Sequence, residues 1–266
     1  MAGDVTLSTE AVLELLQSVA AEVITPRLRS LSSAQIDEKK PGDLVTVADH
    51  ESEELITRAL LDAYPDAVVL GEEAYAGDKD LLQRFRAAAH GFTVDPVDGT
   101  KNFVNGSPDH AVMVAEVVRG ETVRGWIWQP EHEVAMVAER GGGVRRNGEP
   151  VVRKPAGDQP RGATSIWSRR GRHPEGLPAL MGSWLCCGVD YPKLIAAEAD
   201  YLLYGHTKPW DHLPGTLMVR EAGGAAAHRD GTPYSATSQG GGLVVASDPA
   251  TLERARAASE GLWPKK

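Results

Sequence analysis

Residues 95–103, Asp-Pro-Val-Asp-Gly-Thr-Lys-Asn-Phe, constrain this chain more strongly than any other stretch of its sequence. The apolar and β-branched run at residues 91–94 directly before them predicts a short buried strand. Asp95 and Asp98 are three residues apart, so a straight strand would not point both carboxylates the same way. A bend at Pro96 and a turn at Gly99 can bring the two carboxylates to one place.

Two carboxylates held close together repel each other unless a cation lies between them. The backbone N–H groups of Gly99 and Thr100 follow, and they can face an anion if a helical turn begins there. Divalent metal and phosphate chemistry is therefore the first hypothesis. An Asx-rich surface turn between two strands would give the same short pattern, so the choice depends on the rest of the chain.

Composition limits the alternatives. The chain has 266 residues and is 42% apolar, which is enough for one large domain or two tightly joined halves. We find neither an apolar stretch of membrane-spanning length nor a secretory signal pattern at the N-terminus. Cys186 and Cys187 are adjacent and cannot link distant segments, which favours a reducing cytoplasm. The net charge of −9 argues against binding to a nucleic acid polymer.

Further acidic residues occur where predicted elements begin or end. Asp49 follows Thr46 by three residues, as in a capping box, at the start of a predicted helix that ends near Pro65. Glu72 and Glu73 directly follow a predicted strand at residues 67–70, and Asp211 lies at or just before a helix N-terminus. Each of these acids alone can be read as a helix cap or a solvated turn.

The remaining pattern predicts mixed elements. We expect a helix from Ser8 that bends or ends near Pro26, a loop at 32–43, a charged helix around 78–90 and a β-meander over 110–154 with an Asn147-Gly148 turn. Residues 155–182 are rich in Pro, Gly and Arg and predict a passage into a second half. That half should contain helices at 191–199, 214–222 and after Asp248, and strands at 200–204, 225–228 and 242–246. We expect one compact unit with an N-terminal α+β half (1–154), which carries most of the acids, and a C-terminal α/β half (155–266), which carries Asp211.

The acids taken together resemble the inositol monophosphatase family of magnesium-dependent, lithium-sensitive phosphatases, over about residues 10–262. Each motif alone is weak, but all occur in the family's order and spacing. The resemblance implies an α+β fold, a layered αβαβα sandwich of the inositol monophosphatase and fructose-1,6-bisphosphatase type. The irregular mixture of helices and strands agrees with such stacked layers.

The resemblance also implies roles for individual residues. Glu72, Asp95 and the carbonyl of Val97 would hold a first Mg²⁺, and Asp95, Asp98 and Asp211 a second, with two or three ions in all. Glu72 and Thr100, the latter paired with Asp49, would position the attacking water, and the N–H groups of Gly99 and Thr100 would receive the phosphate. Hard oxygen ligands of this kind suit Mg²⁺.

The substrate side departs from the family pattern. Tyr204 stands where family members that act on inositol phosphates often carry a glutamate, and Leu185-Cys186-Cys187 stands where a Gly-Ser/Thr-Ala run is usual. Cys187 and Tyr204 are therefore the expected substrate contacts, and Tyr204 either offers a ring for stacking or packs within its strand. Inositol phosphate, histidinol phosphate, nucleoside 2′- or 3′-phosphates and sugar phosphates all stay open as substrates. Dimers are frequent in this family, and the sequence leaves a homodimer open.

Two other classes compete with this interpretation. Haloacid-dehalogenase phosphatases carry D-x-D-G-T near the N-terminus, whereas the two aspartates here are three apart and begin at residue 95. A catalytically silent, metal-binding regulator on the same scaffold is the second alternative. Loss of any of the five acids would favour that regulator, but Asp49, Glu72, Asp95, Asp98 and Asp211 are all present.

Overall fold

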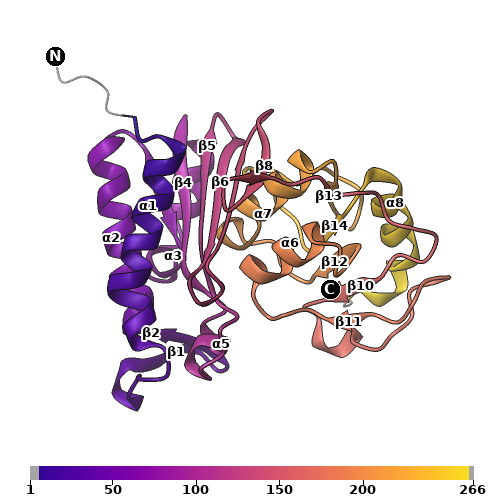
Figure 1. Cartoon of the computed structure of the whole chain (residues 1–266), viewed down its shortest axis with the longest axis horizontal. Helices are drawn as coiled ribbons and strands as arrows, with labels where there is room; N and C mark the ends of the chain where they lie inside the picture. Colours follow the sequence, from indigo (N-terminus) through magenta and orange to yellow (C-terminus); the bar gives the residue numbers. More distant parts are fainter. Residues whose placement is uncertain (1–5, 264–266) are drawn as a thin grey trace.

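The computed structural model describes residues 6–263, and helices and sheets alternate in five layers (Figure 1). Two long helices cover one face of a seven-stranded sheet, two further helices fill the space between this sheet and a five-stranded one, and a last helix covers the outer face of the second sheet. The predicted layered αβαβα sandwich is confirmed.

The first layer holds α1 (Thr9–Val19) and α2 (Val47–Ala63). Ser8 caps α1 by accepting a hydrogen bond from the Ala11 N–H, and the chain continues through a π-helical turn and a 3₁₀ turn that contains Pro26. The predicted capping box is present at α2, where the Thr46 N–H donates to Asp49 Oδ2 at 2.8 Å. These local signals explain why the sequence located both helix starts correctly.

The seven-stranded sheet has the order of its strands along the chain. It contains β3 (Val68–Gly71), β4 (His90–Asp98), β5 (Ala111–Val118), β6 (Glu121–Gln129), β7 (Val134–Glu139), β8 (Gly143–Arg146) and β9 (Glu149–Pro150). Only β3 and β4 run parallel, and the rest form the predicted antiparallel meander. Asn147 and Gly148 have φ angles of 49° and 84°, the left-handed pair that a two-residue hairpin needs between β8 and β9.

The second half contains more regular structure than the sequence predicted. The sheet order is β11-β10-β12-β14-β13, with β10 (Gly162–Thr164), β11 (Met181–Gly182), β12 (Tyr201–Tyr204), β13 (Ala225–His228) and β14 (Leu243–Ala246). The passage predicted at 155–182 therefore contributes two short strands of this sheet. Helix α8 (Pro249–Ala258) begins at Asp248 as expected, because the Asp248 carboxylate accepts from the Thr251 N–H.

The two helices of the middle layer start earlier than predicted. Helix α6 (Cys187–Ile195) was expected at 191–199, and α7 (Pro209–Glu221) was expected at 214–222. Both contain an internal proline, Pro192 in α6 and Pro214 in α7, which obscured the true start. Every residue of α7 from Pro209 to Val219 is buried between the two sheets, so no polar face marks the helical period.

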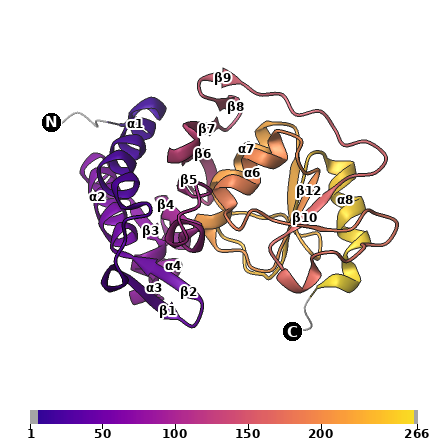
Figure 2. The ribbon, with the colours of Figure 1, turned by 60° about the horizontal axis from the view of Figure 1, so that its bottom comes forward.

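Short elements gather at one end of the first sheet. Strands β1 (Ile36–Lys40) and β2 (Asp43–Thr46) form a hairpin where a loop was predicted at 32–43, and Figure 2 shows this hairpin beside α3 (Glu72–Gly77). The charged helix expected around 78–90 is the shorter α4 (Leu81–Ala87). Helix α5 (Thr100–Val104) directly follows β4. This end of the sheet carries the acidic residues described below.

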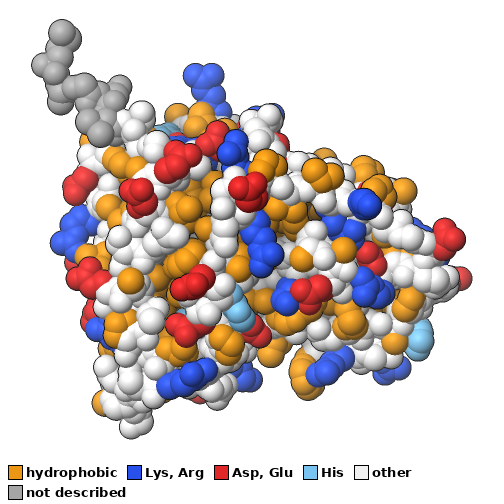
Figure 3. Space-filling view, viewed as in Figure 1, with side chains coloured by type: hydrophobic (Ala, Val, Ile, Leu, Met, Phe, Trp, Pro, Cys, Tyr) orange, Lys and Arg blue, Asp and Glu red, His pale blue; other side chains and the backbone are white. Residues whose placement is uncertain are grey.

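Apolar side chains form three cores between the layers, as expected for stacked sheets and helices. Trp126 is fully buried in the core between the first helices and the sheet. On the face shown in Figure 3, side chains of both charges are interspersed with apolar ones. Among residues 6–263, no helix combines the length and the apolar character that crossing a membrane requires.

Candidate active site

The end of β4 bends as the sequence predicted. Asp95 pairs with Met113 and Asp98 with Ala111, so a step of three residues on β4 matches a step of two on β5. Residues two apart on a strand point to the same face, so this bulge places Asp95 and Asp98 on the same side of the sheet. Gly99 then adopts a φ of 82°, and α5 begins at Thr100. Gly99 and Thr100 are both half-buried.

Three acids from separate parts of the chain meet at this position. Gly71 pairs with Val94 in the parallel register of β3 and β4. The residues that follow them, Glu72 and Asp95, therefore lie beside each other at the same end of the sheet. Asp211 reaches them from the first turn of α7. One carboxylate oxygen of each of these three residues lies within 4.8 Å of those of the other two.

Asp95, the middle acid of this group, has a carboxylate oxygen without a hydrogen-bond donor: Oδ1 is buried and accepts no hydrogen bond from any residue of the described range 6–263. Burial, followed by the charges of Glu72 and Asp98, raises the pKa of Asp95 well above its usual range. Burial and the charge of Glu72 do the same to the pKa of Asp211. Converging carboxylate oxygens that receive few hydrogen bonds are suitable ligands for a hard cation such as Mg²⁺.

Asp98 points toward the start of α6. Its Oδ2 accepts from the Gly188 N–H at 2.5 Å and from Cys186 Sγ at 3.0 Å. Burial is the main cause that raises the pKa of Asp98 to about 6, and the hydrogen bond from Cys186 opposes the rise. Asp98 therefore lies beside the three-acid group without belonging to its closest set of oxygens.

Thr100 and Asp49 come together across 51 positions of sequence. Thr100 Oγ1 lies 3.1 Å from Asp49 Oδ1 and 3.0 Å from the Val97 carbonyl oxygen. Thr46 binds the other carboxylate oxygen of Asp49 through its hydroxyl at 2.6 Å. Burial, the largest influence, raises the pKa of Asp49 to about 7. The cap predicted for Asp49 and its predicted pairing with Thr100 are both present.

The sequence profile of the inositol monophosphatase family matches residues 7–263. The chain belongs to the inositol monophosphatase family. It is 31% identical over 216 residues to an inositol-1-monophosphatase of Rhizobium meliloti, a match that covers 76% of this chain and 78% of the relative. It is 28% identical over 246 residues to the Nus factor SuhB of Vibrio cholerae, with 86% of this chain and 87% of the relative covered.

Solved structures of the family share the fold. An inositol monophosphatase of Thermotoga maritima superimposes with a TM-score of 0.80 and 23% identity, over 95% of this chain and 97% of that one. Family membership supports a phosphatase enzyme and metal dependence in general. It leaves the substrate open, because relatives with different names lie at similar identity.

The sequence did not predict a role for two charged residues near the acidic group, Lys39 and Glu53. Lys39 Nζ lies 2.7 Å from Glu72 Oε1 and 2.9 Å from Glu73 Oε1, so it reaches into the acidic group from the β1–β2 hairpin. Burial opposes the charge of Lys39, but Glu72 and Glu73 outweigh it and raise the pKa of Lys39. Glu53 accepts from the N–H groups of Glu73 and Ala74 at 2.8 and 2.7 Å and so holds the start of α3.

A cavity of about 650 Å³ opens beside the acids and contains both predicted substrate contacts, Cys187 and Tyr204. The Tyr204 side chain is nearly inaccessible, its hydroxyl donates to Asp190 Oδ2 at 3.1 Å, and its ring lies 4.6 Å from that of His212. The packing expected as one alternative for Tyr204 is thus observed, and its ring is covered. Trp167 lines the same cavity and is 70% exposed.

Proposed function

We propose that this protein is a Mg²⁺-dependent phosphomonoesterase that hydrolyses a small phosphate monoester by attack of water. The observation that carries the proposal is the convergence of Glu72, Asp95 and Asp211 around the unpartnered Asp95 Oδ1. A group of buried, mutually repelling carboxylates is costly unless a cation neutralises it.

The ligand assignment follows the resemblance to the family, and the grouping of Glu72, Asp95 and Asp211 supports it. Glu72, Asp95 and the Val97 carbonyl hold one Mg²⁺, while Asp95, Asp98 and Asp211 hold another, with two or three ions at saturation. When bound, such ions activate water and neutralise charge on the transferring phosphoryl group and the leaving oxygen.

The protein residues position the reactants. The Thr100 hydroxyl has one hydrogen, which it donates to Asp49 or to Val97, so its lone pairs stay free to accept from a water molecule. Thr100 and Glu72 hold that water, and the N–H groups of Gly99 and Thr100 receive the phosphate. Lys101 lines the cavity and offers a positive charge to the incoming anion.

The substrate is a small phosphate monoester whose alcohol part enters the cavity that Cys187 and Tyr204 line. Tyr204 lacks the carboxylate that would grip vicinal hydroxyls, which disfavours inositol phosphate by the loss of a hydrogen bond of about 1.5–3 kcal/mol. A ring-bearing monoester such as a nucleotide or histidinol phosphate would stack on the exposed Trp167, because the Tyr204 ring is covered. Sugar phosphates stay in the screen as a further alternative.

We extend the family's other properties to this protein as part of the proposal. It is inhibited by Li⁺ and Ca²⁺, acts in the cytoplasm and forms a homodimer. Its partner is the small-molecule substrate, since the net charge of −9 disfavours a nucleic acid polymer and no membrane-crossing helix occurs within residues 6–263.

The test is phosphate release from the purified protein, with and without Mg²⁺, across inositol, histidinol, nucleoside and sugar monophosphates. We expect Mg²⁺-dependent release, and a loss of turnover by at least about 100-fold in Asp95→Asn, because an amide holds Mg²⁺ poorly. Asp66→Asn is the matched control, since Asp66 is exposed and does not line the cavity. Activity of Asp95→Asn near that of the wild type at saturating Mg²⁺ would refute the metal assignment. Absence of release from every monoester would favour the silent regulator.

A further inference from the structure

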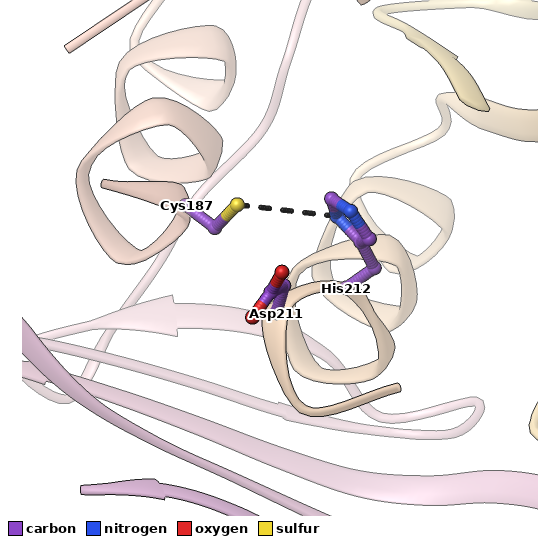
Figure 4. A group of neighbouring side chains, drawn as sticks. All are labelled: Cys187, Asp211 and His212. Carbon is purple, nitrogen blue, oxygen red and sulfur yellow. Dashed lines mark hydrogen bonds between the residues drawn. The ribbon is translucent and has the colours of Figure 1, made fainter. Parts of the chain in front are cut away.

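Cys187, Asp211 and His212 form a second group of ligand-type side chains (Figure 4), and Cys187 and Asp211 line the cavity. One donor atom of each lies within 4.8 Å of the other two, and all three residues are buried. We propose that this group is a binding site for a thiophilic divalent cation, Zn²⁺, separate in ligand chemistry from the all-oxygen group of Glu72 and Asp95.

The helix packing preorganises the three donors. Cys187 is the first residue of α6, while Asp211 and His212 lie in the first turn of α7, and Figure 4 shows the sulfur and the imidazole facing each other beside the Asp211 carboxylate. Cys187 Sγ is 4.0 Å from His212 Nδ1. Zn–S and Zn–N bonds of about 2.3 and 2.05 Å at a tetrahedral angle put these atoms about 3.6 Å apart. A closure of a few tenths of an ångström therefore completes the geometry.

The hydrogen bonds of His212 direct a lone pair at the site. Its Nε2 lies 3.1 Å from the His206 carbonyl oxygen, which can only accept, so Nε2 carries the hydrogen. Nδ1 is then the unprotonated nitrogen, and it accepts from the Tyr191 hydroxyl at 3.0 Å. Zinc-binding histidines commonly donate their second ring N–H to a carbonyl or carboxylate in this way.

The other two ligands are accessible from the cavity. Asp211 and Cys187 both line it, so a fourth coordination position can be taken by water. The Asp211 carboxylate is also approached by a ring nitrogen, since His206 Nδ1 lies 3.5 Å from Asp211 Oδ2. Zinc binds the thiolate form of cysteine, so binding replaces the Cys187 thiol proton, which leaves to solvent through the cavity.

The site has a consequence for catalysis that rests on the proposed function. Asp211 belongs to both groups, since its carboxylate is also within reach of Glu72 and Asp95. Zinc held by Cys187 and His212 engages Asp211 and withdraws it from Mg²⁺. Zinc should therefore inhibit the Mg²⁺-dependent reaction. A small residue in place of Cys187 would lack the thiolate ligand, so the reaction would be less sensitive to zinc.

The experiment titrates the full-length protein with Zn²⁺ against a chromophoric chelator, in excess Mg²⁺ and without substrate. We expect one zinc per chain, and Cys187→Ser should weaken binding by about 100-fold or more, because even outer-shell changes cost about 10–100-fold. Cys186→Ser is the matched control and should keep zinc affinity, because Cys186 Sγ contacts Asp98 instead. Co²⁺ in place of Zn²⁺ should give a thiolate charge-transfer band in the wild type and in Cys186→Ser, but not in Cys187→Ser.

A second variant tests the histidine without removing it. Tyr191→Phe deletes the hydroxyl that competes for His212 Nδ1, so zinc should bind several-fold more tightly than in the wild type. Equal zinc affinity in wild type and Cys187→Ser, absence of the cobalt band, or unchanged affinity in Tyr191→Phe would overturn the site. These binding measurements need no enzymatic activity, so the site can stand if the phosphatase proposal fails, and it can fail if that proposal stands.

Discussion

At the scale of single residues, Lys39 supplies a positive charge inside a concentration of negative ones. It contacts both Glu72 and Glu73, and its side chain is 16% exposed. A buried carboxylate with a close cation is far less costly than one without. Lys39 therefore balances part of the charge that the acidic group concentrates at the sheet edge.

Glu53 gives a pH-dependent prediction. Burial raises the pKa of Glu53 from 4.5 to about 7, although its two backbone hydrogen bonds lower it. Between about pH 4.5 and 7 the folded state thus holds a proton that the unfolded state has lost, so this residue costs stability as pH rises through that window. The cost reaches as much as about 3 kcal/mol above pH 7.

We therefore expect Glu53→Gln to be most destabilised relative to wild type near pH 5, with the difference narrowing as the pH rises to 8. The glutamine side chain stays neutral at every pH, so the stability of the variant does not fall as the pH rises. Wild type loses stability over the same range because Glu53 ionises. Urea unfolding of both proteins at pH 5 and 8, with chelator present, measures this difference. A gap that stays constant or widens toward pH 8 would show that Glu53 is charged in the fold at both values.

The sequence could predict residues that act through local geometry. The Asp95–Asp98 bend and the Thr46–Asp49 cap each follow from residues within four positions of one another. Lys39 and Glu53 escaped because their partners lie 33 and 20 positions away, on elements whose packing no local pattern reveals.

At the scale of elements, the close packing of α6 against α7 sets the position of Asp211. A Cβ on Gly215 would lie 2.1 Å from the ring of Tyr191, which is fully buried on α6. Glycine at this position lets the helices approach closely enough for the first turn of α7 to reach the acids. The burial of α7 on all sides also explains why its start escaped the sequence analysis.

Gly215→Ala should accordingly destabilise the protein by about 1–3 kcal/mol, the usual cost of overpacking a core. Turnover should also fall, because the shift moves Asp211. Gly157→Ala is the matched control, since a Cβ at Gly157 meets no atom within 4 Å. Thermal unfolding and phosphate release are the measurements, and wild-type values in both for Gly215→Ala would exclude this role of the α6–α7 contact.

At the scale of the whole molecule, the acidic site joins the first sheet to the middle helical layer. Glu72 and Asp95 belong to the first sheet region and Asp211 to the helix that separates the sheets. A cation held by all three ties the layers together, and it binds only the folded protein. The sequence predicted these layers and the order of their acids, but not the contacts between layers, which depend on side-chain shapes far apart in sequence.

Magnesium should therefore raise the melting temperature, and a chelator should lower it. At about 100 times the dissociation constant, one bound ion contributes about 2.7 kcal/mol. Asp211→Asn should lose most of the Mg²⁺-dependent increase while it keeps the melting temperature of the metal-free protein or exceeds it, because one repelling charge is gone. A full magnesium response in Asp211→Asn would place the ion outside the interface between the layers.

The position of α7 also affects the protein while it is being synthesised. Strand β6 ends at Gln129, and the helix that covers its inner face ends only at Glu221. At about 5–20 residues per second, a ribosome needs roughly 5–20 s to make the chain between them. During that interval the apolar inner face of the first sheet lacks the cover of α7. We expect the growing polypeptide to need a chaperone at this stage, with folding completed only after α7 leaves the ribosome.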